Sequence, residues 1–302
     1  MKRVAVVYNA RSGALLARAD ASPEDQLTEL FRARGVQADL KPFDMSTLTA
    51  DVRELLTNEP DALVVAGGDG TVRAVAERVL AHEGVPLGIL PLGTMNLLAR
   101  DLGVPGDLEG AADALLDAPV DRIDIATVNG EPFLHSSMLA MLPHLGRIRE
   151  RSRGGKVFGK VRLVEKALRL VRRYPRMPLT IVVDGQEHTI RTRAVVVACN
   201  PLAAGPAPIP GRERLDAGLV AVYVTLERTS WDLVEVVAKL FNGGWRQDER
   251  IRAYEGKTVE VRSSKLALMS VMSDGEIAQL TTPLRYEIRP RALAVLAPGA
   301  AA

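Results

Sequence analysis

The chain has 302 residues, of which 47% are hydrophobic and 25% charged, and its formal net charge is +2. This composition is typical of a folded globular protein with room for two modest domains, and so small a net charge leaves any charged partner to be found in local clusters. The single cysteine, Cys199, excludes an internal disulfide and a cysteine-based metal site, which fits a reducing compartment. No run reaches the roughly 18 apolar residues of a membrane-spanning helix.

Strand-like and helix-like segments alternate over about the first 120 residues. The strand-like runs are 3–8, 36–40, 62–66 and 87–90, and the helical stretches are about 23–34, 47–57, 72–82, 96–102 and 107–117. This alternation predicts a mostly parallel sheet with helices on its faces. In such sheets, ligands bind beyond the carboxyl ends of the strands.

Three loops rich in small residues follow strands of this region. They are Asn9-Ala10-Arg11-Ser12-Gly13, Gly67-Gly68-Asp69-Gly70-Thr71 and Pro91-Leu92-Gly93-Thr94-Met95-Asn96. Glycines let the backbone approach a ligand, and the N–H groups at a helix start hold phosphate oxygens. Thr71 is expected to cap the helix that follows. Asp69 suits a magnesium ion, which prefers oxygen ligands and often keeps several waters. The loops therefore predict phosphate chemistry.

Two common phosphate signatures are missing from these loops. No stretch has the spacing GxxxxGK[ST], and neither glycine-rich turn has the spacing GxGxxG of a dinucleotide-binding fold. A single glycine-rich turn is also an ordinary tight connection in α/β proteins. The presence of two such turns favours a ligand site over that structural interpretation.

Short strands dominate after about residue 121. The segment 121–128 leads through Asn129-Gly130 to 132–135, which is a hairpin signal, and further strands are expected at 179–184, 188–199, 219–226, 257–262, 267–273 and 284–289. We therefore predict an α/β domain at 1–122 and a mainly β, sandwich-like domain at 123–289. The tail, 290–302, is expected to return to the first domain.

Residues 147–176 contain twelve lysines and arginines against two glutamates. From Lys156 to Tyr174 apolar residues recur among these cations at nearly helical spacing, which is typical of a basic amphipathic helix. Such a helix can lie on an anionic membrane surface, although a lone charge run is more often a solvated helix face. Nucleic acid is not expected as a partner, because few aromatic residues interleave with the cations and no recognition motif appears.

With these motifs in order, the chain resembles the diacylglycerol kinase catalytic family of bacterial lipid kinases, which is related to the sphingosine and ceramide kinases. The resemblance covers nearly the whole chain. It rests on the 9–13 loop, the GGDGT turn at 67–71, the segment 91–96 with Leu98-Ala99-Arg100-Asp101-Leu102-Gly103 after it, and Ser273-Asp274-Gly275-Glu276.

The resemblance implies an α/β domain that binds ATP and a β-rich domain that supplies a lipid site, with the γ-phosphoryl group passing to a lipid hydroxyl such as that of diacylglycerol. The nucleotide site would be formed by Asn9, Ala10, Arg11, Ser12, Gly13, Gly67, Gly68, Asp69, Gly70, Thr71, Gly93, Thr94 and Asn96. Asp69 would organise Mg²⁺. Asp274 and Glu276 would activate the acceptor hydroxyl, as carboxylates that accept its proton. As an isolated feature, Asp274-Gly275 would be a β-turn.

The chain departs from the family pattern at two acidic positions. The family usually has an acidic residue where Leu97 stands, and a structural magnesium site of many members uses an aspartate directly before a glycine, where this chain has Ala217 and, one place earlier, Asp216. Asp216, one place early, is the candidate ligand that this segment offers for the second metal site. Together with the basic stretch 147–176 and the single cysteine, these expectations predict a cytoplasmic protein that is attached peripherally to the inner membrane surface through 147–176.

Three functions remain open at this stage. The first is the lipid kinase, and the second is an NAD kinase-like enzyme, because that superfamily also uses GGDGT. The third is a non-catalytic regulator that binds nucleotide and membrane, which the changes at Leu97 and Ala217 suggest. The residues also leave open whether the protein is a homodimer.

Overall fold

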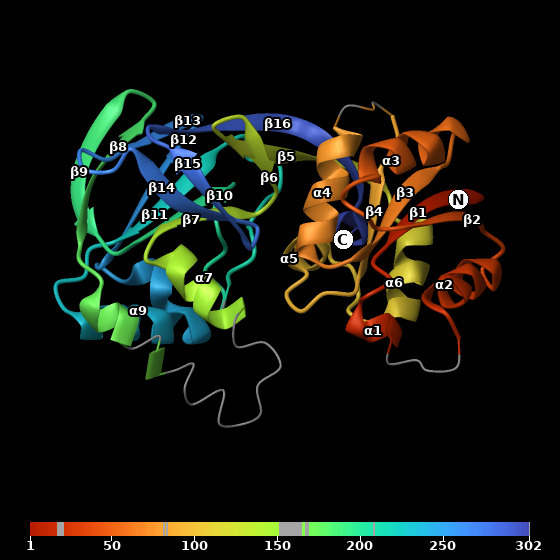
Figure 1. The fold of residues 1–302 in the computed structure, drawn as a ribbon, viewed down its shortest axis with the longest axis horizontal. Coiled ribbons are helices and arrows are strands. Elements are labelled where there is room, and N and C mark those ends of the chain that lie inside the picture. Colours follow the sequence, from red (N-terminus) through yellow and green to blue (C-terminus); the bar gives the residue numbers. More distant parts are fainter. Residues whose placement is uncertain are drawn as a thin grey trace. The chain divides into compact units, whose positions relative to one another are not determined.

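The computed structural model describes residues 1–16, 21–80, 82, 84–150, 165–166, 169–207 and 209–301. The chain forms two compact units (Figure 1): Met1–Asp124 together with Pro290–Ala302, and Ile125–Arg289. Each unit is described by itself.

The first unit is built on a parallel sheet with the strand order β2-β1-β3-β4. Its strands are β1 (Arg3–Tyr8), β2 (Gln37–Pro42), β3 (Ala62–Gly67) and β4 (Leu87–Pro91). Its helices are α1 (Gly13–Leu16), α2 (Pro23–Arg32), α3 (Leu48–Thr57), α4 (Asp69–Val79), α5 (Leu97–Asp101) and α6 (Leu108–Asp117). Every residue of β3 and β4 is buried, as expected of parallel strands that are covered on both faces. The predicted α/β architecture is confirmed.

The last strand of the chain completes this first sheet. Strand β16 (Leu284–Leu296) extends well beyond the expected 284–289, and its end pairs in parallel with β4 through Val295 and Leu87. Backbone hydrogen bonds then join Ala297 to Pro119 and Gly299 to Leu102, at 3.0 and 2.9 Å. The buried end of β16 therefore belongs to the core of the first unit, and two backbone hydrogen bonds hold the chain there as far as Gly299.

The second unit is a β sandwich, as predicted. One layer is antiparallel in the order β12-β11-β10-β7-β14-β15, and the other contains β16, β13, β8 and β9 together with β5 and β6. The strands are β5 (Val120–Val128), β6 (Glu131–Phe133), β7 (Ser136–Ala140), β8 (Met177–Val183), β9 (Gln186–Thr192), β10 (Ala194–Cys199), β11 (Val220–Thr225), β12 (Ile251–Gly256), β13 (Thr258–Arg262), β14 (Leu268–Ser273) and β15 (Glu276–Thr281). The predicted hairpin corresponds to β5 and β6.

Both faces of the antiparallel layer are covered. Val197, Cys199 and Val222 belong to the core between the two sheets, whereas the intervening Ala198 and Tyr223 pack with Trp245 in a second cluster on the other face. That outer face carries α7 (Leu142–Glu150), α9 (Ser230–Asn242) and the short helix η1 (Gly244–Gln247) (Figure 1). Successive residues of a strand point to opposite faces of the sheet, so a strand that is buried on both faces has a continuous apolar sequence, as β10 does.

The structure corrects three sequence expectations. The run 188–199 is two strands, β9 and β10, which belong to different sheets and meet at Arg193. Strand β12 and helices α7 and α9 were not expected at all. Helix α9 carries its own start and stop signals, since Thr229 and Asp232 form a capping box and Gly243 follows the helix with φ of 80°.

The basic stretch 147–176 falls partly outside the described residues. Arg151, Arg153, Lys156, Lys160 and Arg162 lie there, so the amphipathic helix expected from Lys156 to Tyr174 stays a prediction over most of its length. Residues 169–173 are helical. Among the parts of the chain that the structure describes, no helix is both long and apolar enough to cross a membrane.

Candidate functional site

The three predicted nucleotide loops meet at the carboxyl ends of β1, β3 and β4. The backbone N–H of Asn9 donates to the carbonyl oxygen of Ala66 at 2.9 Å, and that of Leu92 donates to Gly67 at 3.0 Å. The buried Ser12 hydroxyl donates to the carbonyl oxygen of Leu92 at 3.1 Å. The loop after β1 and the turn after β4 are thus held together by a side chain that sequence analysis had placed on the nucleotide.

The two glycine-rich turns touch through their backbones. A Cβ atom added to Gly93 would lie 2.6 Å from the Cα atom of Gly68 and 2.7 Å from Oδ1 of Asn96. A Cβ atom on Gly67 would lie 2.8 Å from the Cβ atom of Thr71. Carbon atoms in contact normally stand about 3.5–4.0 Å apart, so these turns meet only because the residues are glycine.

Asp69 has a structural task that its sequence context did not reveal. Its carboxylate accepts the backbone N–H of Asn96 at 2.9 Å and that of Leu97 at 2.6 Å. Asn96 in turn adopts a left-handed conformation, with φ of 46°, and its side chain closes the second turn by bonding both backbone groups of Gly93. The first residue of α4 therefore fixes the start of α5.

The structure shows that Thr71 is not the N-cap residue of α4, although the sequence predicts it to be. Gly68 is the N-cap residue and provides no side-chain hydrogen bond, while Thr71 lies two residues inside the helix start at Asp69 and is buried. The N–H groups of a helix's first turn have no partner within the helix, so an uncapped start of this kind is suited to an anion.

The remaining predicted residues lie at the surface of the first unit. Ala10, Arg11 and Thr94 are exposed, and Gly13 begins the short helix α1. Asn9 shapes its own loop, because its Oδ1 accepts the N–H of Arg11 at 3.0 Å. The structure thus brings the three loops together and leaves several of their groups open to solvent.

In the second unit, Asp274 fixes a backbone segment as well as a turn. Asp274 and Gly275 have φ of 48° and 91° and connect β14 to β15, which is the β-turn that the dipeptide alone predicts. The Asp274 carboxylate also accepts the backbone N–H groups of Leu134, His135 and Ser136, at 2.6, 2.9 and 3.1 Å. Glu276 begins β15 and is exposed.

The same segment borders the larger apolar cavity of this unit. The cavity has a volume of about 400 Å³ and is lined by His135 and Ser136 together with apolar side chains from sheet, helices and loops, among them Met138, Val196, Leu233, Leu240 and Trp245. Its size and lining are those of a small-molecule site. Sequence analysis missed these residues, because generic apolar residues scattered over the chain give no motif.

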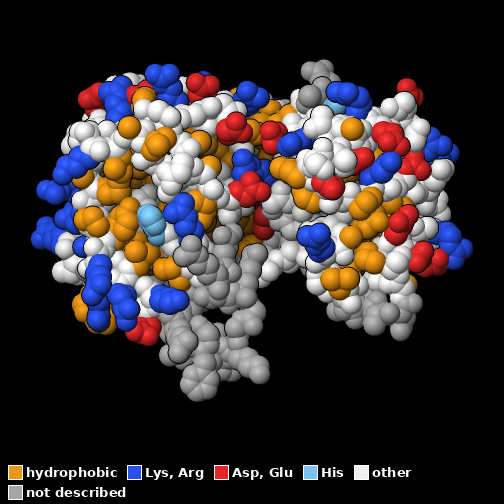
Figure 2. All heavy atoms as spheres, in the orientation of Figure 1, with side chains coloured by type: hydrophobic (Ala, Val, Ile, Leu, Met, Phe, Trp, Pro, Cys, Tyr) orange, Lys and Arg blue, Asp and Glu red, His pale blue; other side chains and the backbone are white. Residues whose placement is uncertain are grey.

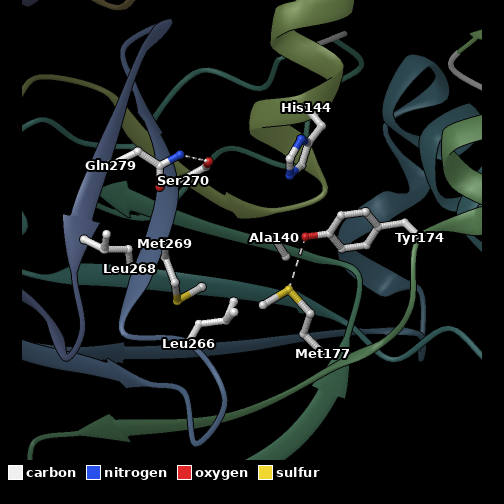
Figure 3. Close-up of a pocket in the computed structure, with 9 residues that line it drawn as sticks. All are labelled: Ala140, His144, Tyr174, Met177, Leu266, Leu268, Met269, Ser270 and Gln279. Atoms are coloured by element: carbon white, nitrogen blue, oxygen red, sulfur yellow. Dashed lines mark hydrogen bonds between the residues drawn. The ribbon is translucent and has the colours of Figure 1, made fainter.

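A second, smaller cavity of about 140 Å³ lies beside β14 (Figure 3). The rings of His144 and Tyr174 stand 5.5 Å apart at one side of it, and Gln279 donates to the Ser270 hydroxyl at 2.6 Å on the other. Burial, and to a lesser degree the charge of Arg147, lowers the pKa of His144.

The predicted metal ligands do not form a cluster. Among the described residues there is no group of three or more histidine, cysteine, aspartate or glutamate side chains that could hold a metal. Asp216 pairs with Arg214 at 2.9 Å, and Asp69 binds the start of α5. Magnesium commonly takes one or two protein carboxylates and completes its shell with phosphates and waters, so Asp69 alone fits that mode.

Comparisons with known proteins cover both units. The model of the diacylglycerol kinase catalytic domain matches residues 3–128, and that of the YegS C-terminal NAD kinase beta sandwich-like domain matches residues 147–297. An uncharacterized Synechocystis protein is 26% identical over 80% of this chain, which spans only 56% of that protein. A Staphylococcus haemolyticus protein named "Putative lipid kinase" is 27% identical over 80% of this chain and 77% of its own.

The fold also matches solved structures. A diacylglycerol kinase structure from Bacillus anthracis superposes with a TM-score of 0.73 over 100% of this chain and 98% of its own, at 20% identity. Such a likeness shows the fold, while the two domain matches together show the family. The chain belongs to the diacylglycerol kinase-like family of lipid kinases.

Proposed function

We propose that this protein is an ATP- and Mg²⁺-dependent lipid kinase that transfers the γ-phosphoryl group to the hydroxyl of diacylglycerol or a related lipid. The observation that carries the proposal lies within the second unit. The carboxylate of Asp274 holds the segment 134–136, and His135 and Ser136 of that segment line the apolar cavity. A candidate proton acceptor and a space for alkyl chains therefore share one backbone segment.

The first unit supplies the nucleotide side of this proposal. Its glycine turns expose backbone at the carboxyl ends of three strands, where open α/β sheets bind ligands. The uncapped start of α4 suits a phosphate, and Asp69 is the residue that would hold Mg²⁺ there. When bound, the ion would neutralise phosphate charge.

The second unit would position the acceptor. Phosphoryl transfer depends mainly on positioning and on charge neutralisation, with a carboxylate accepting the acceptor's proton. Three backbone hydrogen bonds fix the Asp274 carboxylate in one place, which meets the first requirement. The exposed Glu276 is the second candidate for the proton.

The change at Leu97 has a structural explanation in this chain. Its side chain is buried in the core, and its backbone N–H still donates to Asp69. The position that is usually acidic in the family therefore contributes an apolar side chain to the core of this chain. Asp69 is then the carboxylate that the two glycine-rich turns contain. This leaves the proposed magnesium role with Asp69.

The direct test is transfer of label from γ-labelled ATP in the presence of Mg²⁺. The acceptors are lipid alcohols in mixed micelles, with NAD as a soluble acceptor in parallel reactions, and the organic and aqueous phases are counted separately. Label in a lipid supports the proposal and identifies its acceptor class. Label in NAD alone assigns the NAD kinase-like function, and ATP binding without transfer to any acceptor favours the regulator.

The test of Asp69 needs a variant that preserves the fold. Asp69→Ala removes both hydrogen bonds to α5, so its loss of activity would not separate metal binding from turn structure. Asp69→Asn keeps one carbonyl oxygen as acceptor and removes the charge. We expect it to lose transfer and to show a weaker dependence on Mg²⁺, whereas Asp117→Asn, at the exposed end of α6, should match the wild type. Full transfer by Asp69→Asn would refute the metal role.

A further inference from the structure

The apolar residues of helix α9 extend beyond the face that the helix buries. Leu233 and Val236 are buried and line the large cavity of the second unit. Next to this buried face, Trp231, Val237 and Phe241 are 64%, 47% and 61% exposed. A surface helix normally has a polar outer face, so the exposed residues need an explanation other than the fold.

The exposed residues form one stripe along the helix. Trp231, the half-buried Val234, Val237 or Ala238, and Phe241 follow each other at intervals of three or four residues. The two aromatic residues are ten positions apart, which is about 15 Å along the helix axis. Val237 is exposed and also lines the cavity. The stripe therefore borders the cavity wall.

Acidic groups on α9 are engaged within the protein. Asp232 accepts the backbone N–H groups of Arg228 and Thr229, which holds its pKa below the usual range, and Glu235 pairs with Arg250 at 2.5 Å. These contacts keep both carboxylates near the helix start and the neighbouring loop. The apolar stripe itself carries no charged residue.

Free cations stand near the start of the same helix. Arg172, Arg173 and Arg228 are exposed and form no ion pair among the described residues. The carbonyl oxygen of Tyr174, the residue after Arg173, accepts a hydrogen bond from the Arg193 side chain at 2.8 Å. Arg193 also pairs at 3.4 Å with Glu227, which directly precedes Arg228, so Arg193 links the two segments that carry these arginines. Figure 2 shows Lys and Arg side chains around hydrophobic ones on this unit.

We propose that the outer face of α9 docks on an anionic lipid bilayer. Trp231 and Phe241 lie in the interfacial layer, where aromatic side chains are favoured, and the arginines bind anionic headgroups. The inference rests on the proposed lipid acceptor, because a helix that faces the bilayer on one side and the cavity on the other gives a lipid chain a short way into the protein. A second copy of this chain would cover the stripe equally well but would bring the arginines of the two copies together.

The experiment uses Trp231 as its own reporter. The chain has two tryptophans, and Trp245 is buried, so the variant Trp245→Phe leaves the exposed Trp231 as the only tryptophan, whose emission is excited selectively over that of the tyrosines. Titration with vesicles that contain anionic phospholipid, without ATP, should shift its emission to the blue and protect it from acrylamide. Vesicles of phosphatidylcholine alone should give a weaker shift.

Partition into the same vesicles measures the contribution of each ring. Burial of an aromatic side chain stabilises the bound state, so Trp231→Ala or Phe241→Ala should weaken the binding to sedimented vesicles by about tenfold to a hundredfold. The matched control is Met45→Ala, which removes a side chain of 55% exposure from the first unit and should have no effect. Arg172→Ala with Arg173→Ala should reduce binding to anionic vesicles and its dependence on salt.

Each outcome separates docking from catalysis. An unshifted Trp231 emission, or equal sedimentation of the wild type and the aromatic variants, overturns the docking surface. Dissociation of a dimer by Trp231→Ala without any vesicle binding also overturns it, since the stripe is then an interface between copies. Vesicle binding without label transfer to any lipid contradicts the proposed kinase and still supports the docking surface. Label transfer in micelles without vesicle binding supports the kinase and overturns the docking surface.

Discussion

Replacement of Gly93 by alanine tests the contact between the two glycine turns. The added Cβ atom would lie 2.6 Å from the Cα atom of Gly68, and a carbon contact needs about 3.5 Å, so one of the two backbones has to move by about 1 Å. Overpacking of this kind costs about 1–3 kcal/mol of unfolding free energy. A displacement of about 1 Å at a phosphate site also lowers turnover, on the order of a hundredfold.

Two measurements on one pair of variants check this expectation. Urea unfolding followed by circular dichroism gives the stability, and label transfer at varied ATP concentration gives kcat/KM. Gly106→Ala is the matched control, because no heavy atom lies within 4 Å of its added Cβ atom. If Gly93→Ala equals Gly106→Ala in stability and in kcat/KM, the close approach of the two turns does not determine the nucleotide site.

Three further expectations concern the second unit. Asp274→Asn should lower kcat while the KM for ATP stays the same, and a raised KM for ATP would contradict the acceptor-side role of Asp274. The same variant loses one hydrogen-bond acceptor for the backbone, which should lower the free energy of unfolding in urea by about 1–3 kcal/mol. Val196→Trp should fill the apolar cavity and raise the KM for lipid, and an unchanged KM would place the alkyl chains elsewhere. Burial lowers the pKa of His144 in the folded protein. The free energy of unfolding is therefore at its full value above the pKa of about 6.5 that a histidine has in the unfolded chain, and it decreases as the pH falls from there through the folded pKa. His144→Gln should flatten this acid-side slope in urea unfolding relative to the wild type, and equal slopes would show that His144 does not titrate in this way.

The first unit was predictable because its signals are local. Buried parallel strands such as 62–66 are short apolar runs, and β3 and β4 are each followed by a turn that contains glycine before the next helix begins. What local signals did not show is how the turns use their polar groups. Asp69 lies 27 residues before Asn96 in the chain and still bonds its backbone, a contact that only the adjacency of β3 and β4 creates.

The second unit was predictable in class and less so in detail. The break at Arg193 was missed because neither a glycine nor a proline marks it, so the polar strand β9 runs directly into the apolar strand β10. Helix α9 was missed although Thr229, Asp232 and Gly243 mark its ends, since it contains three valines, which are β-branched residues typical of strands. The cavity has no sequence signal, because its walls come from many separate segments.

The return of β16 to the first sheet affects the order in which the protein can fold during synthesis. The sheet β2-β1-β3-β4 leaves the ribosome early, but one side of β4 is paired only when Val295 arrives. Until then that edge presents unpaired backbone groups to other nascent chains. The whole second unit is made in this interval, so the half of the protein that would bind the nucleotide is started first and completed last.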